Sequence, residues 1–81
     1  MHVTVRLFAR LHELAGRSEI ARELPPGATA EDAWQAIVAE HPLMASYSRA
    51  ISCAVNASYV KLNRPLADGD EVVFMPPVSG G

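Results

Sequence analysis

Only one segment of this 81-residue chain is long and regular enough to form a helix of several turns. Thr29 can cap its start, and acidic residues follow near the positive end of the helix dipole. Apolar residues then recur at helical spacing between Ala33 and Val38. Pro42 biases the residue before it away from helical angles, so the helix should end near Glu40. The rest of the core must come from other elements.

Short apolar runs and alternating patterns, typical of β-strands, fill most of the remaining chain. The expected order is a strand over 2–7, a short helix over 9–15 with Gly16 as its C-cap, a strand over 18–24, the long helix, a loop or single helical turn over 43–49, and strands over 53–55, 59–62 and 71–75. Turns are expected at Pro25-Pro26-Gly27, Asn56-Ala57-Ser58 and Asp68-Gly69-Asp70. One main helix on one face of a mixed four- to five-stranded sheet is an α+β two-layer domain.

Size and composition exclude several classes of function. The chain is long enough for one domain, and its formal net charge of −2 provides no basic surface for nucleic acid or an anionic membrane. Its apolar runs are far shorter than the roughly 20 residues that span a bilayer, and no signal peptide is evident. The single cysteine, Cys53, cannot form an internal disulfide and fits a reducing compartment. We expect a cytoplasmic protein.

Side-chain chemistry is sparse. His2, His12 and His41 have no metal-ligand spacing, so no metal site is expected. Cys53 lies in an apolar strand, where a buried, unreactive thiol is expected rather than a persulfide carrier. The acidic residues of 68–71 are interpreted as turn residues rather than a cation site. Because no glycine-rich phosphate loop is present, any nucleotide chemistry must be carried out by a partner.

Strand alternation predicts an apolar patch on the face of the sheet away from the helix. Glu71 marks the polar side of the last strand, so Val73 and Met75 should lie on that side. Tyr59 points outward by the same rule, and Phe8 does so if the first strand continues that far. Phe8 could instead cap the first strand beneath the short helix. Exposed apolar patches of about a few hundred Å² commonly mark partner surfaces.

The sequence ends in Pro76-Pro77-Val78-Ser79-Gly80-Gly81. Glycine has no Cβ, so a Gly-Gly end can enter a slot too narrow for any side chain, while the two prolines stiffen the chain before it. We therefore divide the chain into a folded domain over 1–75 and a flexible tail over 76–81, whose six residues reach at most roughly 20 Å. A linker end with no chemistry of its own is the alternative.

Several motifs together resemble the small, sulfur-carrying subunit of molybdopterin synthase. They are Leu7-Phe8-Ala9, Glu13-Leu14-Ala15-Gly16, Val55-Asn56, Pro65-Leu66 followed by Asp68-Gly69-Asp70-Glu71-Val72, and the closing Pro-Pro-Val-Ser-Gly-Gly. The similarity covers essentially the whole chain, and the closing block is its most specific part. The resemblance implies a β-grasp, ubiquitin-like fold.

The resemblance also implies a mechanism centred on Gly81. An ATP-using adenylyltransferase of the ubiquitin-activating type would convert its carboxylate to an acyl adenylate, and a sulfur donor protein would displace AMP to leave a thiocarboxylate. The tail from Pro76 through Gly80 would then enter the synthase large subunit, where the sulfur attacks a cyclic pyranopterin precursor. The implied synthase is a heterotetramer of two small and two large subunits. By the same resemblance this chain would bind no cofactor and contribute no catalytic side chain, and the patch of Phe8, Tyr59, Val73 and Met75 would bind both enzymes in turn.

Three other functions remain open at the level of sequence. The sulfur carrier of thiamine biosynthesis shares the fold, the Gly-Gly end and the thiocarboxylate, although the Pro-Pro-Val stalk favours the molybdopterin carrier. A ubiquitin-like modifier would join Gly81 to a lysine of a target protein. A plain interaction module would use an unmodified tail.

Overall fold

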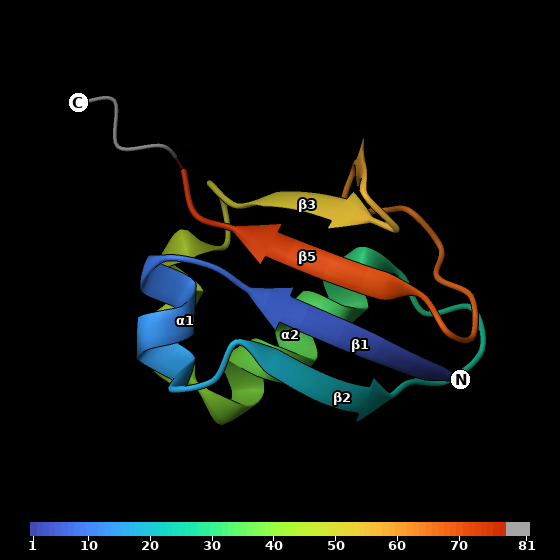
Figure 1. Cartoon of the computed structure of the whole chain (residues 1–81), viewed down its shortest axis with the longest axis horizontal. Helices are drawn as coiled ribbons and strands as arrows, with labels where there is room; N and C mark the ends of the chain where they lie inside the picture. Colours follow the sequence, from blue (N-terminus) through green and yellow to red (C-terminus); the bar gives the residue numbers. More distant parts are fainter. Residues whose placement is uncertain (78–81) are drawn as a thin grey trace.

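The first and last strands pair in parallel at the centre of a five-stranded sheet (Figure 1). The computed structural model describes residues 1–77, so the predicted tail residues Val78, Ser79, Gly80 and Gly81 lie outside the described residues. The strands are β1 (His2–Leu7), β2 (Glu19–Glu23), β3 (Ser52–Val55), β4 (Ser58–Val60) and β5 (Glu71–Met75), in the spatial order β2-β1-β5-β3-β4. All neighbouring pairs except β1–β5 are antiparallel.

Helix α2 (Ala30–Glu40) crosses one face of this sheet and confirms the expected main helix. Its N-terminus is closed by a capping box, in which the Asp32 amide donates to Thr29 Oγ1 at 3.3 Å and the Thr29 amide donates to Asp32 Oδ2 at 2.8 Å. The mixed sheet with one main helix across it confirms the α+β, β-grasp architecture. The division into a domain over 1–75 and a tail stays a prediction.

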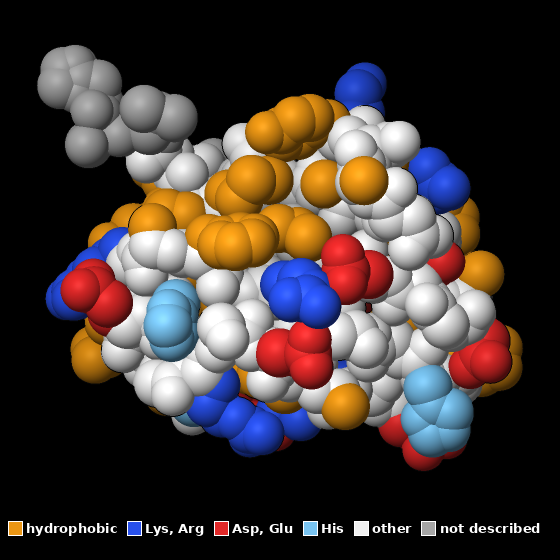
Figure 2. Space-filling model, in the orientation of Figure 1, with side chains coloured by type: hydrophobic (Ala, Val, Ile, Leu, Met, Phe, Trp, Pro, Cys, Tyr) orange, Lys and Arg blue, Asp and Glu red, His pale blue; other side chains and the backbone are white. Residues whose placement is uncertain are grey.

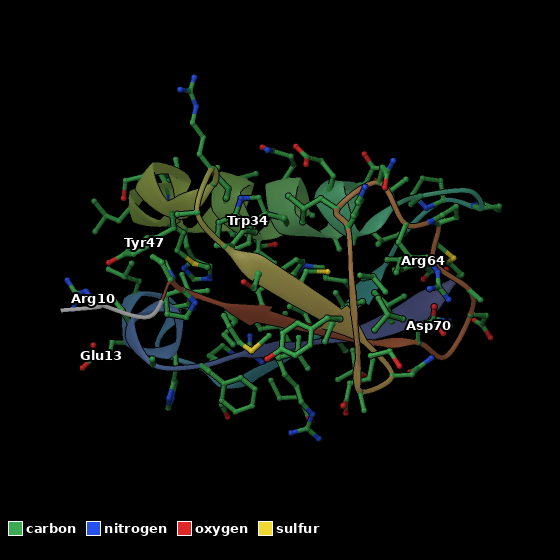
Figure 3. The ribbon with its side chains drawn as sticks, turned by 90° about the horizontal axis from the view of Figure 1, so that it is seen from above. Arg10, Glu13, Trp34, Tyr47, Arg64 and Asp70 are labelled. Carbon is green, nitrogen blue, oxygen red and sulfur yellow. The ribbon has the colours of Figure 1, made fainter. Side chains whose placement is uncertain are left out.

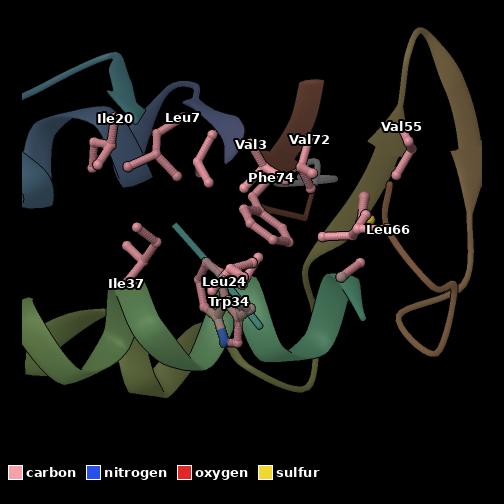
Figure 4. Packing of buried hydrophobic residues seen from close by; sticks show 14 of the residues in the cluster. Val3, Leu7, Ile20, Leu24, Trp34, Ile37, Val55, Leu66, Val72 and Phe74 are labelled. Atoms are coloured by element: carbon pink, nitrogen blue, oxygen red, sulfur yellow. The ribbon is translucent and has the colours of Figure 1, made fainter. Parts of the chain in front are cut away.

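The core lies between α2 and the inner face of the sheet (Figure 4). Trp34 and Phe74 meet edge to face with ring centroids 5.2 Å apart, a favourable aromatic geometry. Trp34 also donates its indole N–H to Ser48 Oγ at 2.9 Å, so its polar atom is satisfied. Val72 and Phe74 are fully buried, as the alternation of the last strand predicts.

Two short helices complete the chain. Helix α1 (Arg10–Ala15) starts one residue later than expected, because Ala9 has φ 53° and ψ −127°, outside the helical region. Gly16 closes it in the left-handed conformation, as predicted. The segment expected to be a loop or single turn is a 3₁₀ helix, η1 (Pro42–Tyr47). Within residues 1–77, no helix has the length and apolar character needed to cross a membrane.

The β3–β4 hairpin is tighter than the sequence indicates. Asn56 and Ala57 both have positive φ, so a two-residue turn joins the strands and Ser58 already pairs with Val55. The expected strand over 59–62 is wrong at its end, since β4 stops at Val60. The chain leaves the sheet there because the Leu62 carbonyl accepts the Glu31 amide of α2 at 2.8 Å.

Candidate functional site

The face of the sheet opposite α2 has a defined set of outward residues. Cross-strand partners lie on the same face of a sheet, so the register identifies them. One row crosses β1, β5, β3 and β4 through Arg6, Val73, Ala54 and Tyr59. The next row pairs Met75 with Ser52, and a third pairs Thr4 with Glu71. We refer to this side as the outer face.

Apolar residues gather on one part of the outer face (Figure 2). Tyr59 is 77% exposed and Phe8 is 49% exposed, whereas Val73 and Met75 are half-buried. The Tyr59 hydroxyl lies 4.0 Å from Met75 Sδ, which joins β4 to the end of β5. We call Phe8, Ala54, Tyr59, Val73 and Met75 the apolar patch.

The structure thus brings together the side chains that strand alternation selects. Leu7 pairs with Phe74, so Phe8 follows at the level of Met75. Phe8 is half exposed, which does not fit the alternative in which it is covered by α1. Sequence reasoning missed Ala54, which is 7% exposed yet does not belong to the core cluster. Its signal is the alternation of Ser52 and Ala54 with the buried Cys53 and Val55.

Charged residues border the apolar patch on the side of β1 and β2, and we call them the charged row although they come from more than one cross-strand pair. Arg6 donates from Nε to Glu71 Oε2 at 2.7 Å, and its Nη2 lies 2.9 Å from Glu19 Oε1. The hydrogen bond and charge of Glu71, followed by the charge of Glu19, raise the pKa of Arg6 above its usual range. Further along β2, Glu23 lies 4.0 Å from His2 Nδ1. Sequence reasoning missed this row because it depends on strand register.

The chain leaves the sheet beside the apolar patch. Strand β5 is hydrogen-bonded on both sides, to β1 and to β3, and Met75 is its last residue. Pro76 is half-buried and Pro77 is exposed. The other residues predicted to act in the tail, Val78 through Gly81, lie outside the described residues.

The acidic segment before β5 forms a turn, as predicted. Asp70 accepts from the Ala67 amide at 2.8 Å and from Asn56 Nδ2 at 2.9 Å, and these hydrogen bonds hold its pKa below the usual range. Asp68 accepts from the His2 amide at 2.6 Å. Figure 3 shows that this turn lies at the end of the molecule opposite Arg10 and Glu13 of α1.

Cys53 is buried at 3% exposure in β3, which confirms the expected buried thiol. Loss of hydration on burial raises the pKa of this thiol, so the reactive thiolate is disfavoured. The described part of the chain, residues 1–77, contains no cluster of three potential metal-ligating side chains and encloses no pocket.

Comparisons with known proteins agree with this geometry. The model of the ThiS family matches residues 5–81. A curated relative from Chlamydomonas reinhardtii, named molybdopterin synthase sulfur carrier subunit, is 41% identical over 83 residues and covers 100% of both chains. The crystal structure of SAMP1, the small archaeal modifier protein 1 of Haloferax volcanii, is similar with a TM-score of 0.85, 33% identity and 100% coverage of both chains.

A second similar structure contains two proteins. It is the complex of subunits 1 and 2 of molybdopterin-converting factor from Helicobacter pylori. The matching chain has a TM-score of 0.69 and 27% identity, with 100% of each chain covered.

Proposed function

Because this chain belongs to the ThiS family, we propose that it is the sulfur carrier of molybdenum cofactor biosynthesis, acting as the small subunit of molybdopterin synthase. The observation that carries the proposal is the position of the apolar patch, directly beside the end of β5 from which the tail continues. A partner that recognises the patch therefore also holds the root of the tail.

The proposed chemistry takes place at the Gly81 carboxylate. A free carboxylate is a poor electrophile, so the adenylyltransferase first joins it to AMP from ATP and releases pyrophosphate. Sulfide sulfur from the donor protein then attacks the acyl carbon and AMP leaves, which gives the thiocarboxylate. In the synthase large subunit this sulfur attacks a carbon of the pyranopterin precursor, and the oxygen substituent on that carbon leaves. Hydrolysis of the resulting acyl linkage returns the Gly81 carboxylate.

Residues 1–77 contribute recognition and anchorage in this proposal. The patch offers side chains that bury apolar surface against a partner, a non-directional contribution that two different enzymes can both use. Pro76 and Pro77 limit the angles at which the chain leaves β5. Gly80 and Gly81 pass through a narrow channel because they have no side chains. ATP is bound by the activating enzyme.

The complex from Helicobacter pylori supports the choice of partner. By analogy, we propose that this chain binds a synthase large subunit, in an assembly of two small and two large subunits. The interaction with the adenylyltransferase and with the sulfur donor rests on the chemistry of the tail alone. We propose that all of these steps take place in the cytoplasm.

Intact mass spectrometry of the protein from its native cells tests the proposal. Replacement of one oxygen by sulfur, a gain of about 16 Da, is expected in part of the population. Deletion of Gly81, or addition of one alanine after it, should abolish both the mass shift and molybdopterin formation. Sulfur transfer by either variant would refute chemistry at this terminus.

The similarity to SAMP1 favours one second function, conjugation of Gly81 to lysines of other proteins. The same mass experiment distinguishes it, because a modifier appears as covalent adducts of higher mass. The phenotype of cells that lack this chain distinguishes the two kinds of sulfur carrier. Loss of molybdopterin supports the proposed function, and a requirement for added thiamine supports the thiamine carrier.

A further inference from the structure

The outer face is divided into an uncharged half and an acidic half. Among residues 1–77, the outward positions of β3, β4 and β5 beyond Glu71 carry no charge. The outward positions of β1 and β2, together with Glu71, carry three carboxylates and one guanidinium, a net charge of −2 with His2 neutral. These charged residues are Arg6, Glu19, Glu23 and Glu71.

The acidic half is held in place by its own ion pairs. Arg6 contacts Glu19 and Glu71 at 2.9 and 2.7 Å, so both carboxylates are fixed before a partner arrives. A carboxylate accepts several hydrogen bonds, so each retains capacity for a second cation. The two pairs with Arg6 also leave one negative charge uncompensated. Preorganised groups lose little freedom when they bind, and this favours recognition.

We propose that the outer face is a docking surface in two parts. The apolar patch anchors the partner, and the acidic half on β1 and β2 favours a partner whose binding surface has arginine and lysine residues along its edge. This inference rests on the proposed function, and its partner is the synthase large subunit. Complementary charge accelerates encounter and fixes orientation more than it adds affinity. A second copy of this chain fits the surface poorly, because it brings the same net negative charge.

The orientation matters because the apolar patch includes Met75, the last residue of β5, directly before the predicted tail. The apolar patch permits rotation of a partner about it, since apolar contacts are not directional. Cationic side chains that meet Glu19 and Glu23 fix that rotation. The tail, which leaves the sheet beside Met75, is then aimed at one place on the partner.

Association kinetics with the large subunit of the same organism test the inference. Glu23→Lys changes an exposed carboxylate that makes no ion pair with Lys or Arg among residues 1–77 and lies 4.0 Å from His2 Nδ1. We expect association to slow by roughly tenfold at 0.01 M salt, where the Debye length is about 30 Å. The matched control is Glu31→Lys at an exposed position of α2, on the other side of the sheet, which changes the total charge equally and should slow association by less than about twofold. Both rates should approach the wild-type rate at 1 M salt.

Arg6→Gln is expected to change the association rate in the opposite direction, which makes the test more specific. It removes the one cation among these four residues, so association at 0.01 M salt should become roughly threefold faster. Thermal melting of each variant checks that it is folded. Equal effects of Glu23→Lys and Glu31→Lys, or no effect of either, would overturn the inference.

The proposed function has its own outcome in the same assay. Met75→Asp adds a negative charge yet should weaken binding, because it places that charge within the apolar patch. If Met75→Asp weakens binding and Glu23→Lys does not, the patch docks the partner and the acidic half plays no part. If the wild-type chain does not bind the large subunit at all, both the proposed partner and the proposed docking surface are refuted.

Discussion

Two alanines adopt backbone conformations that glycine reaches more easily. Ala57 has φ 72° as the second residue of the β3–β4 turn, and Ala9 has φ 53° and ψ −127° between β1 and α1. A Cβ in such regions costs of order 1 kcal/mol. The strain at Ala9 lies directly after Phe8, at the point where the chain turns from the sheet into α1.

Ala57→Gly is expected to stabilise the fold by about 0.5–1 kcal/mol, because Asn-Gly suits a two-residue turn of positive φ. The midpoint of urea unfolding should rise with an unchanged slope. Ala67→Gly is the matched control, since Ala67 is exposed and does not have positive φ. A gain of equal size at Ala67 would contradict this interpretation of the turn.

Cys53 is expected to be inert in the folded protein. A thiol reagent at pH 7.5 should modify it only after addition of denaturant, because burial removes access and raises the pKa of the thiol. Cys53→Ala should leave unchanged the fraction of the protein that carries the thiocarboxylate, measured from the intact mass relative to the unmodified variant. Loss of the sulfur-bearing species in this variant would point to a persulfide step on Cys53.

Residue orientation was predictable where a polar residue marks the phase of a strand. Glu71 sets the phase of β5, and Val72 and Phe74 are buried as that phase requires. The expected strand over 53–55 left out Ser52, the polar residue that marks the phase of β3, and the remaining run Cys53-Ala54-Val55 is wholly apolar. Ala54 was missed for this reason.

At the level of elements, the start of α2 is fixed both by residues next to it in the sequence and by residues far along the chain. The Thr29 side chain caps Asp32, which the local pattern predicts. The next free amides are satisfied from far along the chain, because Ala30 donates to the Arg64 carbonyl at 3.0 Å and Glu31 to that of Leu62 at 2.8 Å. No local pattern reveals these contacts, and they explain why β4 is short.

Thr29→Ala is expected to destabilise the protein by about 1 kcal/mol, since it leaves a helix amide without its acceptor. Thr29→Ser keeps the hydroxyl and should recover most of this loss. Urea unfolding followed by circular dichroism measures both. Equal stability of the alanine and serine variants would show that the cap contributes nothing.

The turn before β5 makes the stability depend on pH. Hydrogen bonds from Ala67 and Asn56 lower the pKa of Asp70 in the folded state. Its contribution is therefore complete above the ordinary aspartate pKa of about 3.9 and is lost as pH falls through the lower folded-state value.

Asp70→Asn should accordingly reduce the free energy of unfolding at pH 7 and have a smaller effect near pH 3. The measurement is urea unfolding at several pH values. Glu31→Gln controls for the loss of one negative charge at an exposed position. A deficit in Asp70→Asn that stays constant from pH 7 to 3 would exclude the ionised carboxylate as its cause.

At the scale of the molecule, one face of the sheet is buried in the core, and we propose that the other face binds a partner. Met75→Asp is expected to weaken binding of the synthase large subunit by more than tenfold without unfolding the domain, because Met75 is half-buried on the outer face. Leu43→Asp is the matched control, since Leu43 is 75% exposed on η1, away from the apolar patch. Isothermal titration calorimetry measures both, and equal losses would refute the assignment of the docking face.

The α+β class and the outward set of Phe8, Tyr59, Val73 and Met75 could be predicted from alternation and helix signals. The charged row could not, because Arg6, Glu19 and Glu71 are brought together by pairing between β1, β2 and β5. Register over such distances depends on the whole core. Part of the candidate site is therefore a property of the assembled sheet, absent from any single segment.

The central position of β5 has a consequence for how the sheet is assembled. Among the described strands β5 comes last in the sequence, and both β1 and β3 pair with it. A nascent or truncated chain that lacks it has a sheet split in two, without the middle of the docking face. The surface beside the predicted tail therefore forms only when β5 has joined the sheet, so folding of the domain and formation of the proposed docking face are one event.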